Sequence, residues 1–491
     1  MSKKAQDNSW EYEADLVVIG FGGAGAATAI TAADLGASVI LLEKAPFGEE
    51  GGNTRVSAQG YWNPSCPQSA KMYLKALSGP HVLPEDIVDA WALEMCENNA
   101  WLRRIGGDPQ EHQHPPVGIE YPELPGADSV RKYHHGDILG YSKTWEFLAR
   151  SVRKRPIDVH YETPAHRLVQ DPVSKAVVGV EARRAGEAIR FKASKAVVLT
   201  CGGFENNQEM IRNYLPGVLV CHTSGSPYNE GDGVRMGIEA GADLWHMNNF
   251  AGPSMALKVP EYPTTFSMRA LHFSQLVSGA MIVVGPDAKR FTNEKYKLRH
   301  GKVKKSGVWA TFVPPCPMYM IFDQAMLDAG PLYDGKPTHG WTQIMSGYSW
   351  SDNNRAELEK GWIKSAPTLP ELASKLKLCG RHLMDTIRRW NDMCLHGEDA
   401  EFGRELMLTA FGAGPYYAVE LSPSMLNTQG GPRRNACAQV VRPDGTPIPR
   451  LYSAGELGSI YAYLYQGTGN VGECFAFGRI AARNAVRESR Q

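Results

Sequence analysis

The sequence has no excess of charge of either sign. Its 52 lysine and arginine residues are matched by 52 aspartate and glutamate residues, and the sequence pI is about 7.2. A protein that follows a nucleic acid backbone or an anionic lipid surface usually carries a basic excess. We therefore expect neither nucleic acid nor a membrane surface as a partner.

Long apolar runs and paired cysteines are also missing. No stretch approaches the roughly 18 uninterrupted apolar residues of a membrane helix, and the polar segment Met1–Asp15 lacks the apolar core of a signal peptide. The nine cysteines form no C-x-x-C pair, which excludes the zinc, iron–sulfur and haem-attachment patterns. These absences predict a cytoplasmic protein with reduced thiols, no stable membrane insertion and no bound metal.

Glycine is abundant, with 50 residues, and it clusters first near the N-terminus. The apolar run Asp15–Gly20 has the length and composition of a strand, Ala26–Ala33 is typical of a helix, and Ser38–Glu43 is a second strand. Between the first two lies G-x-G-x-x-G, ending at Gly25. Its glycines allow a tight turn, close approach of backbone N–H groups to a pyrophosphate, and close packing of helix on strand. The segment predicts a dinucleotide-binding unit in which Glu43 accepts hydrogen bonds from a ribose.

Further glycine-rich segments suggest a larger, flat ligand. Gly51–Gly60 follows the second strand, Gly445–Glu456 is expected to form a turn and a strand ending at an acid, and Gly467–Ala485 opens glycine-rich and becomes a helix. The helix N-terminus could face an electronegative ring edge. The residues expected to bind the cofactor are Gly20, Gly22, Gly23, Ala24, Gly25, Glu43, Lys44, Gly52, Asn53, Thr54, Ser57, Gly60, Thr200, Gly202, Gly203, Asn229, Asp232, Gly455, Glu456, Gly469, Asn470 and Val471.

Taken in order, these motifs resemble the flavoprotein subunit family of fumarate reductase and succinate dehydrogenase, which includes the soluble 3-ketosteroid dehydrogenases. The resemblance covers most of the chain. Besides the segments above, it depends on Ala196–Phe204, Asn229–Gly237, Lys289–Glu294 and Asn427–Gly431.

The resemblance implies an α/β fold: a Rossmann-like, glutathione-reductase-like FAD-binding domain with an inserted α+β capping domain. The FAD-binding domain would comprise residues 1–243 and 415–491, and the capping domain residues 244–414. The apolar spacing of Leu369–Cys394 predicts a helix within the cap. Membrane-bound relatives attach flavin through a histidine in the segment matching Gly51–Gly60, which has none here. The FAD is therefore expected to be non-covalent.

By the same resemblance, the protein is an FAD-dependent oxidoreductase acting on CH–CH groups. One substrate carbon gives hydride to flavin N5 while a base removes the proton from the neighbouring carbon, next to a carbonyl. Fumarate-reducing relatives hold the dicarboxylate with a histidine and an arginine, but the matching positions are Asn427 and Gln466, which cannot pair with a carboxylate as cations do. Ketosteroid dehydrogenases have a tyrosine before a glycine-rich stretch, and here Tyr465 and the Gly469 N–H match those that bind the ketone oxygen.

The acid/base stays open at this stage. In relatives it follows the R-F-x-N-E motif, where strict spacing reaches Leu298, which cannot transfer protons. A one-residue deletion brings Tyr296 or Arg299 into place, and the surrounding basic run Lys295–Lys305 could lower a tyrosine pKa or form a solvated surface strip.

Three functions follow from this reading. The first is a dehydrogenase that introduces a C=C bond beside the carbonyl of a cyclic ketone, steroid-like or smaller, with an external electron acceptor. The second is a reductase of an α,β-unsaturated acid or ketone, and the third a non-catalytic FAD-binding protein. No sequence motif indicates an oligomeric state.

Overall fold

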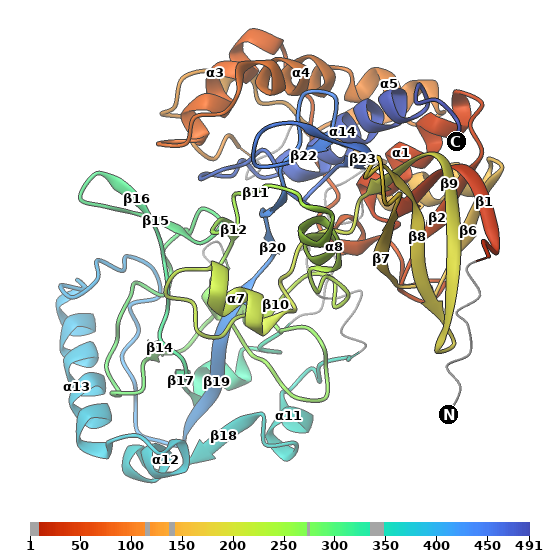
Figure 1. Ribbon diagram of the computed structural model, residues 1–491. Helices are drawn as coiled ribbons and strands as arrows, with labels where there is room; N and C mark the ends of the chain where they lie inside the picture. Colours follow the sequence, from red (N-terminus) through yellow and green to blue (C-terminus); the bar gives the residue numbers. More distant parts are fainter. Residues whose placement is uncertain (1–8, 113–117, 137–142, 273–274, 334–347) are drawn as a thin grey trace.

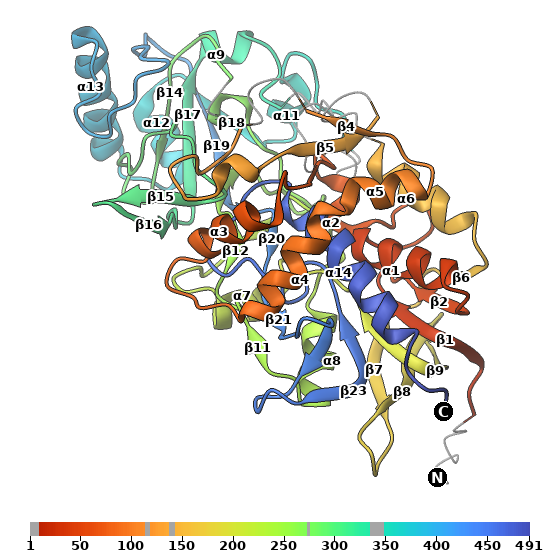
Figure 2. The same ribbon diagram turned by 90° about the horizontal axis from the view of Figure 1, so that it is seen from above.

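The computed structural model describes residues 9–112, 118–136, 143–272, 275–333 and 348–491, and it shows two adjoining parts (Figure 1). One part is built on a large, mainly parallel sheet, which contains the first described strand and lies beside the C-terminal helix. The other part is built on a smaller, mainly antiparallel sheet flanked by helices. Strand β19 belongs to this second sheet and leads back towards the first part, and the turned view shows the same division (Figure 2).

The large sheet begins with the predicted dinucleotide-binding unit. β1 (Tyr12–Ile19) pairs in parallel with β2 (Val39–Leu42), and α1 (Gly23–Asp34) connects them. These elements confirm the expected strand–helix–strand order. The sheet has the order β22-β23-β9-β1-β2-β6, with the hairpin β7–β8 attached to β9. Its remaining strands are β6 (Ile157–His160), β7 (Ala165–Gln170), β8 (Val177–Arg184), β9 (Glu187–Leu199), β22 (Gln439–Val441) and β23 (Pro447–Ser453).

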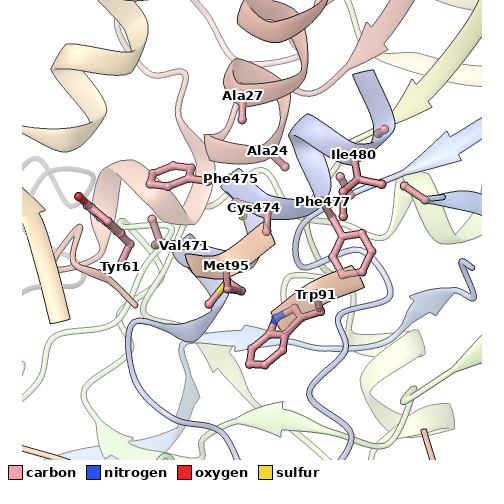
Figure 3. Close-up of a cluster of buried hydrophobic side chains, with 14 of the residues drawn as sticks. Ala24, Ala27, Tyr61, Trp91, Met95, Val471, Cys474, Phe475, Phe477 and Ile480 are labelled. Carbon is pink, nitrogen blue, oxygen red and sulfur yellow. The ribbon is translucent and has the colours of Figure 1, made fainter. Parts of the chain in front are cut away.

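The C-terminal helix α14 (Gly469–Ala485) returns to this sheet and packs on α1. The small residues of α1 permit the close approach: a Cβ at Gly478 of α14 would lie 2.9 Å from the Ala24 carbonyl oxygen. Figure 3 shows the apolar cluster around α14, in which Phe475 and Phe477 lie with Trp91 and Met95 of α4. Burying this helix against α1 and α4 joins the two ends of the sequence in one core.

Further helices and a small sheet surround that core. Their bounds are α2 (Gly52–Val56), α3 (Pro67–Leu77), α4 (Glu85–Cys96), α5 (Asn98–Arg104), η1 (Ala127–Ser129), α6 (Thr144–Arg153), α7 (Gln208–Tyr214), α8 (Asp232–Ala240), β3 (Tyr61–Trp62), β4 (Pro109–Glu111) and β5 (Lys132–His135). The strands β3, β5 and β4 pair in that order.

The second part is organised by β19 (Tyr416–Met425), which pairs with β10, β13, β17 and β18. The other elements of this part are β10 (His222–Thr223), β13 (Ser254–Ala256), η2 (Arg269–Leu271), β14 (Met281–Val284), β17 (Met318–Asp323), α9 (Gln324–Asp328), α11 (Arg355–Glu359), β18 (Ile363–Ala366), α12 (Leu369–Leu376) and α13 (Gly380–His396). Short pairs connect it to the first part: β11 (Leu244–Trp245) with β21 (Gly431–Pro432), and β12 (Phe250–Ala251) with β20 (Asn427–Thr428). The hairpin of β15 (Lys302–Lys305) and β16 (Val308–Thr311) projects from this part.

One predicted element is wrong. The single helix expected over Leu369–Cys394 is two helices, α12 and α13. Lys377 adopts a left-handed conformation (φ 57°) at the end of α12, which stops the helix. The new helix begins at Gly380. The apolar residues keep a helical spacing across the break between α12 and α13, so the sequence pattern did not indicate the break.

The sheet of the second part crosses one expected domain boundary. The predicted FAD-binding domain includes residues 416–425, whereas β19 pairs with β17 and β18 of the second part. The division into domains stays a prediction. In the part of the chain that the structure describes, no helix has both the length and the apolar character needed to cross a membrane.

Candidate active site

A cleft of about 800 Å³ opens at the carboxyl ends of β1, β2 and β9. This edge is where open α/β sheets bind ligands, because the glycine turn and the N-terminus of α1 face it. The predicted residues that line it are Gly20, Gly22, Gly23, Ala24, Glu43, Lys44, Gly52, Asn53, Thr54, Thr200, Gly202, Asn229, Asp232 and Glu456. The cleft thus brings together residues from segments more than 400 positions apart.

The glycine turn leaves no room for side chains. Gly20 has φ +101°, and a Cβ at Gly25 would lie 1.9 Å from the Gly20 carbonyl oxygen. A ligand phosphate could therefore approach the backbone at the N-terminus of α1, where the helix dipole favours negative charge. Gly23 N–H donates to Thr54 Oγ1 at 3.1 Å, which ties the turn to the second glycine cluster.

Glu43 closes the cleft beside this turn. Its carboxylate accepts hydrogen bonds from the Phe21 and Ala45 N–H groups, both at 2.7 Å, and burial raises its pKa. The neighbouring Lys44 pairs with Asp232 at 2.7 Å. The carboxylate is thus held in one orientation at the end of β2, where a ribose would be bound.

Two buried carboxyl groups meet at Asn53. Its Nδ2 donates to Glu205 Oε1 at 2.7 Å and to Glu456 Oε2 at 3.0 Å, and its Oδ1 accepts from Ser226 N–H. Burial raises the pKa of both carboxyls, and the proximity of Glu205 raises that of Glu456 further. Sequence reasoning missed Glu205, although it lies only two positions after the predicted Gly203.

The remaining predicted residues are not among those that line the cleft: Gly25, Ser57, Gly60, Gly203, Gly455, Gly469, Asn470 and Val471. Gly203 faces Glu205 and Thr428, and a Cβ at Gly455 would lie 2.8 Å from the Ala24 Cβ. Lining residues that the motifs did not indicate include Phe21, Thr163 and Tyr228. Only their nearness to the motifs in sequence or across the sheet could have suggested them.

The N-terminus of α14 carries the predicted ketone-binding pair. The Tyr465 hydroxyl oxygen accepts from Asn470 N–H at 3.3 Å, and Gly469 N–H donates to the Gln466 carbonyl at 2.9 Å. Burial raises the pKa of Tyr465, so its hydroxyl is protonated at neutral pH. The structure therefore brings Tyr465 and Gly469 together, with the Gly469 N–H already engaged in the turn.

Several buried polar atoms here lack a hydrogen-bond partner among the described residues: Tyr461 Oη, Thr468 Oγ1 and Asn470 Oδ1. Unpaired polar atoms are rare in folded interiors and mark places where a ligand or water is bound. The unpaired atoms at α14 and the glycine cradle at α1 fit the two ends of a dinucleotide, and the residues present therefore suit FAD.

The positions that bind a dicarboxylate in fumarate-reducing relatives are occupied by neutral amides in both cases. Gln466 Oε1 accepts from the Tyr73 hydroxyl at 2.8 Å and from Glu120 N–H at 3.1 Å. Asn427 and Gln466 are both buried. Their side chains serve the packing of the site and supply no positive charge.

Sequence reasoning missed an ion pair beside Tyr465. His300 Nε2 lies 2.9 Å from Glu120 Oε2, and the His300 ring lies edge-on to Tyr465 with centroids 4.7 Å apart. Glu120 and His300 are 180 residues apart, and Glu120 belongs to no motif. His300 lies within the basic run Lys295–Lys305, directly after the predicted Arg299, but no role as acid or base was predicted for it.

The predicted acid/base residues lie in the loop before β15. The Tyr296 side chain is 45% exposed. Arg299 pairs with Glu123 at 2.9 Å and lies over the rings of Tyr121 and Trp309. The basic run is only partly solvated, since Lys295 and Lys302 are buried. Tyr296 and Arg299 do not line the cleft, and neither do Tyr465 and His300. The roles of Tyr296 and Arg299 stay predictions.

The fold and the cleft define a dinucleotide-binding flavoprotein, and comparisons with known proteins identify its family. Residues 15–471 match the family model described as FAD binding domain. The urocanate reductase of Eggerthella lenta is 30% identical over 511 residues, covering 96% of this chain and 75% of that protein. The 3-oxosteroid 1-dehydrogenase of Mycobacterium tuberculosis is 27% identical, covering 96% of this chain and 98% of that protein.

Solved structures show the same fold. The 3-ketosteroid delta1-dehydrogenase of Sterolibacterium denitrificans, in complex with 1,4-androstadiene-3,17-dione, has a TM-score of 0.74 and 21% identity, covering 96% of this chain and 99% of that one. The open form of a flavocytochrome c3 fumarate reductase has a TM-score of 0.69 and 23% identity, covering 99% and 82%.

The chain belongs to the FAD-binding family that includes fumarate reductases and 3-oxosteroid dehydrogenases. It is an FAD-dependent oxidoreductase with a Rossmann-like FAD-binding domain and a capping domain, as the motifs predicted. The comparisons include both dehydrogenases and reductases. They define the class of reaction, and the residues of the site have to indicate the substrate.

Proposed function

We propose that the protein desaturates a cyclic ketone, steroid-like or smaller, next to its carbonyl group. The observation that carries this proposal is the position of Tyr465, a protonated hydroxyl at the N-terminus of α14, in a site where neutral amides replace the cations that a dicarboxylate needs. An external acceptor would collect the electrons.

FAD would be held by the glycine turn, Glu43, Asn53 and the N-terminus of α14. When bound, it supplies the hydride acceptor of the reaction. Each predicted domain would contribute one part of the active site. The FAD-binding domain (residues 1–243 and 415–491) supplies Tyr465. The capping domain (residues 244–414) covers the substrate and supplies the proton-transferring group.

The chain's own residues polarise the ketone. When an α-proton leaves, negative charge develops on the carbonyl oxygen, and a hydrogen-bond donor already in place stabilises that charge. Tyr465 can donate because its hydroxyl hydrogen is not used in the contact with Asn470, where it accepts. The Gly469 N–H would have to be shared with Gln466.

Reduction of an α,β-unsaturated acid is the second candidate. A relative at 30% identity is a urocanate reductase, which favours the reductive direction. Lys132 and Lys302 are buried cations near the site, and a substrate carboxylate could use them. The absence of charge at Asn427 and Gln466 argues against a dicarboxylate.

Anaerobic mixing with a panel of saturated cyclic ketones, followed at the flavin absorbance band, tests the proposal. Bleaching by one ketone class, with an enone or dienone as product, is the expected result. Tyr465→Phe should lower the bleaching rate by about 10²–10³-fold while FAD stays bound. Tyr416→Phe, in which a hydroxyl bonded to the Gly412 carbonyl is lost, is the matched control.

The reductase alternative predicts a different experimental result. If no ketone bleaches the flavin, but dithionite-reduced enzyme is reoxidised by an unsaturated acid, the reductase is the function. Failure in both directions would mean that the substrate is neither a cyclic ketone nor an unsaturated acid, and the proposal would fall.

A further inference from the structure

We propose that His300, positioned by Glu120, removes and returns the α-proton of the substrate. This inference rests on the proposed function and assigns the acid/base that sequence reasoning sought at Tyr296 or Arg299. It depends on the geometry of a side-chain cluster from three segments: the loop before η1, the loop before β15 and the turn before α14.

The cluster converges on Gly467. A Cβ at this position would lie 2.4 Å from Glu120 Oε1 and 3.2 Å from His300 Nε2, so only glycine leaves room for the pair. The His300 ring lies edge-on to Tyr465 at 4.7 Å between centroids. A base therefore lies next to the hydroxyl that would bind the carbonyl, on the side from which a neighbouring α-proton could be removed.

The backbone of His300 is fixed. His300 has φ 48°, and its carbonyl accepts from Gly252 N–H at 3.0 Å. A Cβ at the next residue, Gly301, would lie only 1.6 Å from the Gly252 carbonyl oxygen. A left-handed conformation costs energy for a non-glycine residue and persists where the surroundings enforce it, often at functional sites.

Glu120 lies beside the histidine as a buried carboxylate. Burial opposes ionisation of Glu120, but His300 and Lys132, at 3.9 Å, overcome it and hold its pKa at about 2. Glu120 Oε2 lies 2.9 Å from His300 Nε2 and has no hydrogen-bond partner among the described residues, so the carboxylate acts on the ring through its charge. A negative charge at this distance stabilises the imidazolium that forms when the substrate proton is taken up.

Other charged and titratable groups surround the pair. They are Lys132 on β5, Tyr73 on α3, Tyr121 and Glu123 beside Glu120, Arg299 and Lys302 beside His300, and Tyr465 before α14. Arg299 is neutralised by Glu123. Among the described residues, Glu120 is the only carboxylate paired directly with His300. It is therefore the negative charge that acts most strongly on the His300 ring.

The proton step is balanced without any redox change. The Cα–H bond of the ketone breaks, its proton goes to the unprotonated ring nitrogen of His300, and the electron pair forms the enolate C=C bond as the carbonyl π electrons move to oxygen. Tyr465 donates a hydrogen bond to that oxygen. Reversal returns a proton to the α-carbon, so the step exchanges α-hydrogen with solvent even when no hydride can leave.

Solvent exchange by reduced holoenzyme isolates this step. The enzyme is reduced anaerobically with dithionite in D₂O and incubated with 5α-androstane-3,17-dione or cyclohexanone, and deuterium in the recovered ketone is measured by mass spectrometry across a pH series. Wild-type protein should exchange α-hydrogen well above the buffer rate. His300→Asn should lower exchange at least about 100-fold, and His396→Asn, an exposed histidine at the end of α13, should not change it.

Glu120→Gln provides a second, independent readout. Loss of the carboxylate removes stabilisation of the imidazolium, so the maximal exchange rate should fall about tenfold, and Glu120→Asp, which keeps the charge, should restore part of it. Retained flavin absorbance and thermal midpoint show that each variant is folded. Wild-type exchange in His300→Asn, an unchanged rate in Glu120→Gln, or loss of exchange in Tyr296→Phe instead would overturn the assignment.

The two proposals fail in different ways. If oxidised wild-type flavin is bleached by a ketone and His300→Asn is bleached equally fast, the ketone dehydrogenase stands and His300 is not the base. If wild-type protein neither exchanges nor is bleached by any ketone, the proposed function fails and the role of His300 fails with it.

Discussion

At the scale of single residues, the glycine turn at the start of α1 tolerates the fewest substitutions. A methyl group at residue 25 would overlap the Gly20 carbonyl oxygen at 1.9 Å, and that oxygen is a backbone atom of the turn, which cannot swing away as a side chain could. Gly25→Ala should therefore shift the turn and weaken FAD binding by at least about tenfold, or about 1.4 kcal/mol. Titration of the flavin-free protein with FAD, followed by quenching of flavin fluorescence, measures the change.

Gly412→Ala is the matched control, because a Cβ there meets no atom within 4 Å and the residue has no positive φ. Equal FAD affinity in both variants would contradict the close packing of the turn.

Residues of the site differ in how far the sequence could predict them. Glu43 and Asn53 lie in local patterns of fixed spacing, so their place in the cleft was predictable. Glu120 and His300 meet only because the loop before β15 packs on the turn before α14, and no local pattern encodes a contact between segments 180 residues apart. The spacing rule for the acid/base reached Leu298, which cannot transfer protons, so the sequence left the choice among the neighbouring residues open.

At the scale of elements, α4 shows how a surface helix supports the site. Met95 is fully buried against Gly472 of α14, whereas Leu93 on the same helix is 60% exposed. Met95→Ala should lower the free energy of unfolding by about 2–5 kcal/mol, because it leaves a cavity beside α14. Leu93→Ala should stay within about 0.5 kcal/mol.

Urea unfolding of both variants with saturating FAD, followed by circular dichroism, provides the comparison. Similar losses in the two variants would mean that α4 does not pack on α14 as the structure shows.

The elements near the N-terminus were predictable because strand, turn and helix follow one another without interruption. The break between α12 and α13 was not, because the apolar positions of Leu369–Cys394 keep a helical period across Lys377. The pairing of β19 with β17 and β18 is a long-range contact. It was not predictable, because the sequence pattern of a strand does not indicate which other strand it pairs with.

At the scale of the whole molecule, the two ends of the chain meet at Asp15. Its carboxylate pairs with Arg490 at 2.8 Å and binds Ser38 and Ser194. Burial opposes ionisation, but these partners lower the pKa of Asp15 from 3.8 to about 2. Since the folded-state pKa is below the unfolded value, the contribution is fully present above about pH 4 and is lost as the pH falls towards 2.

Asp15→Asn should therefore cost about 1–2 kcal/mol at neutral pH. The gap between the thermal midpoints of wild type and variant should narrow as the pH is lowered from 5 towards 3. Asp352→Asn, at an exposed position in the second part, should keep a constant gap. A gap for Asp15→Asn that does not change with pH would exclude the carboxylate as its cause.

The cofactor connects both ends of the sequence in the same way, because the cleft combines the first sixty residues with Glu456 and Cys474. A ligand that binds only the folded state stabilises it by about 2.7 kcal/mol at one hundred times its Kd. Removal of FAD should lower the thermal midpoint by several degrees, and FAD, unlike NAD at equal concentration, should restore it. Since Gly51–Gly60 contains no histidine, trichloroacetic acid should release the yellow flavin into the supernatant. Flavin fluorescence retained in the denatured polypeptide would instead show a covalent bond, and the attachment point would then have to lie outside that segment.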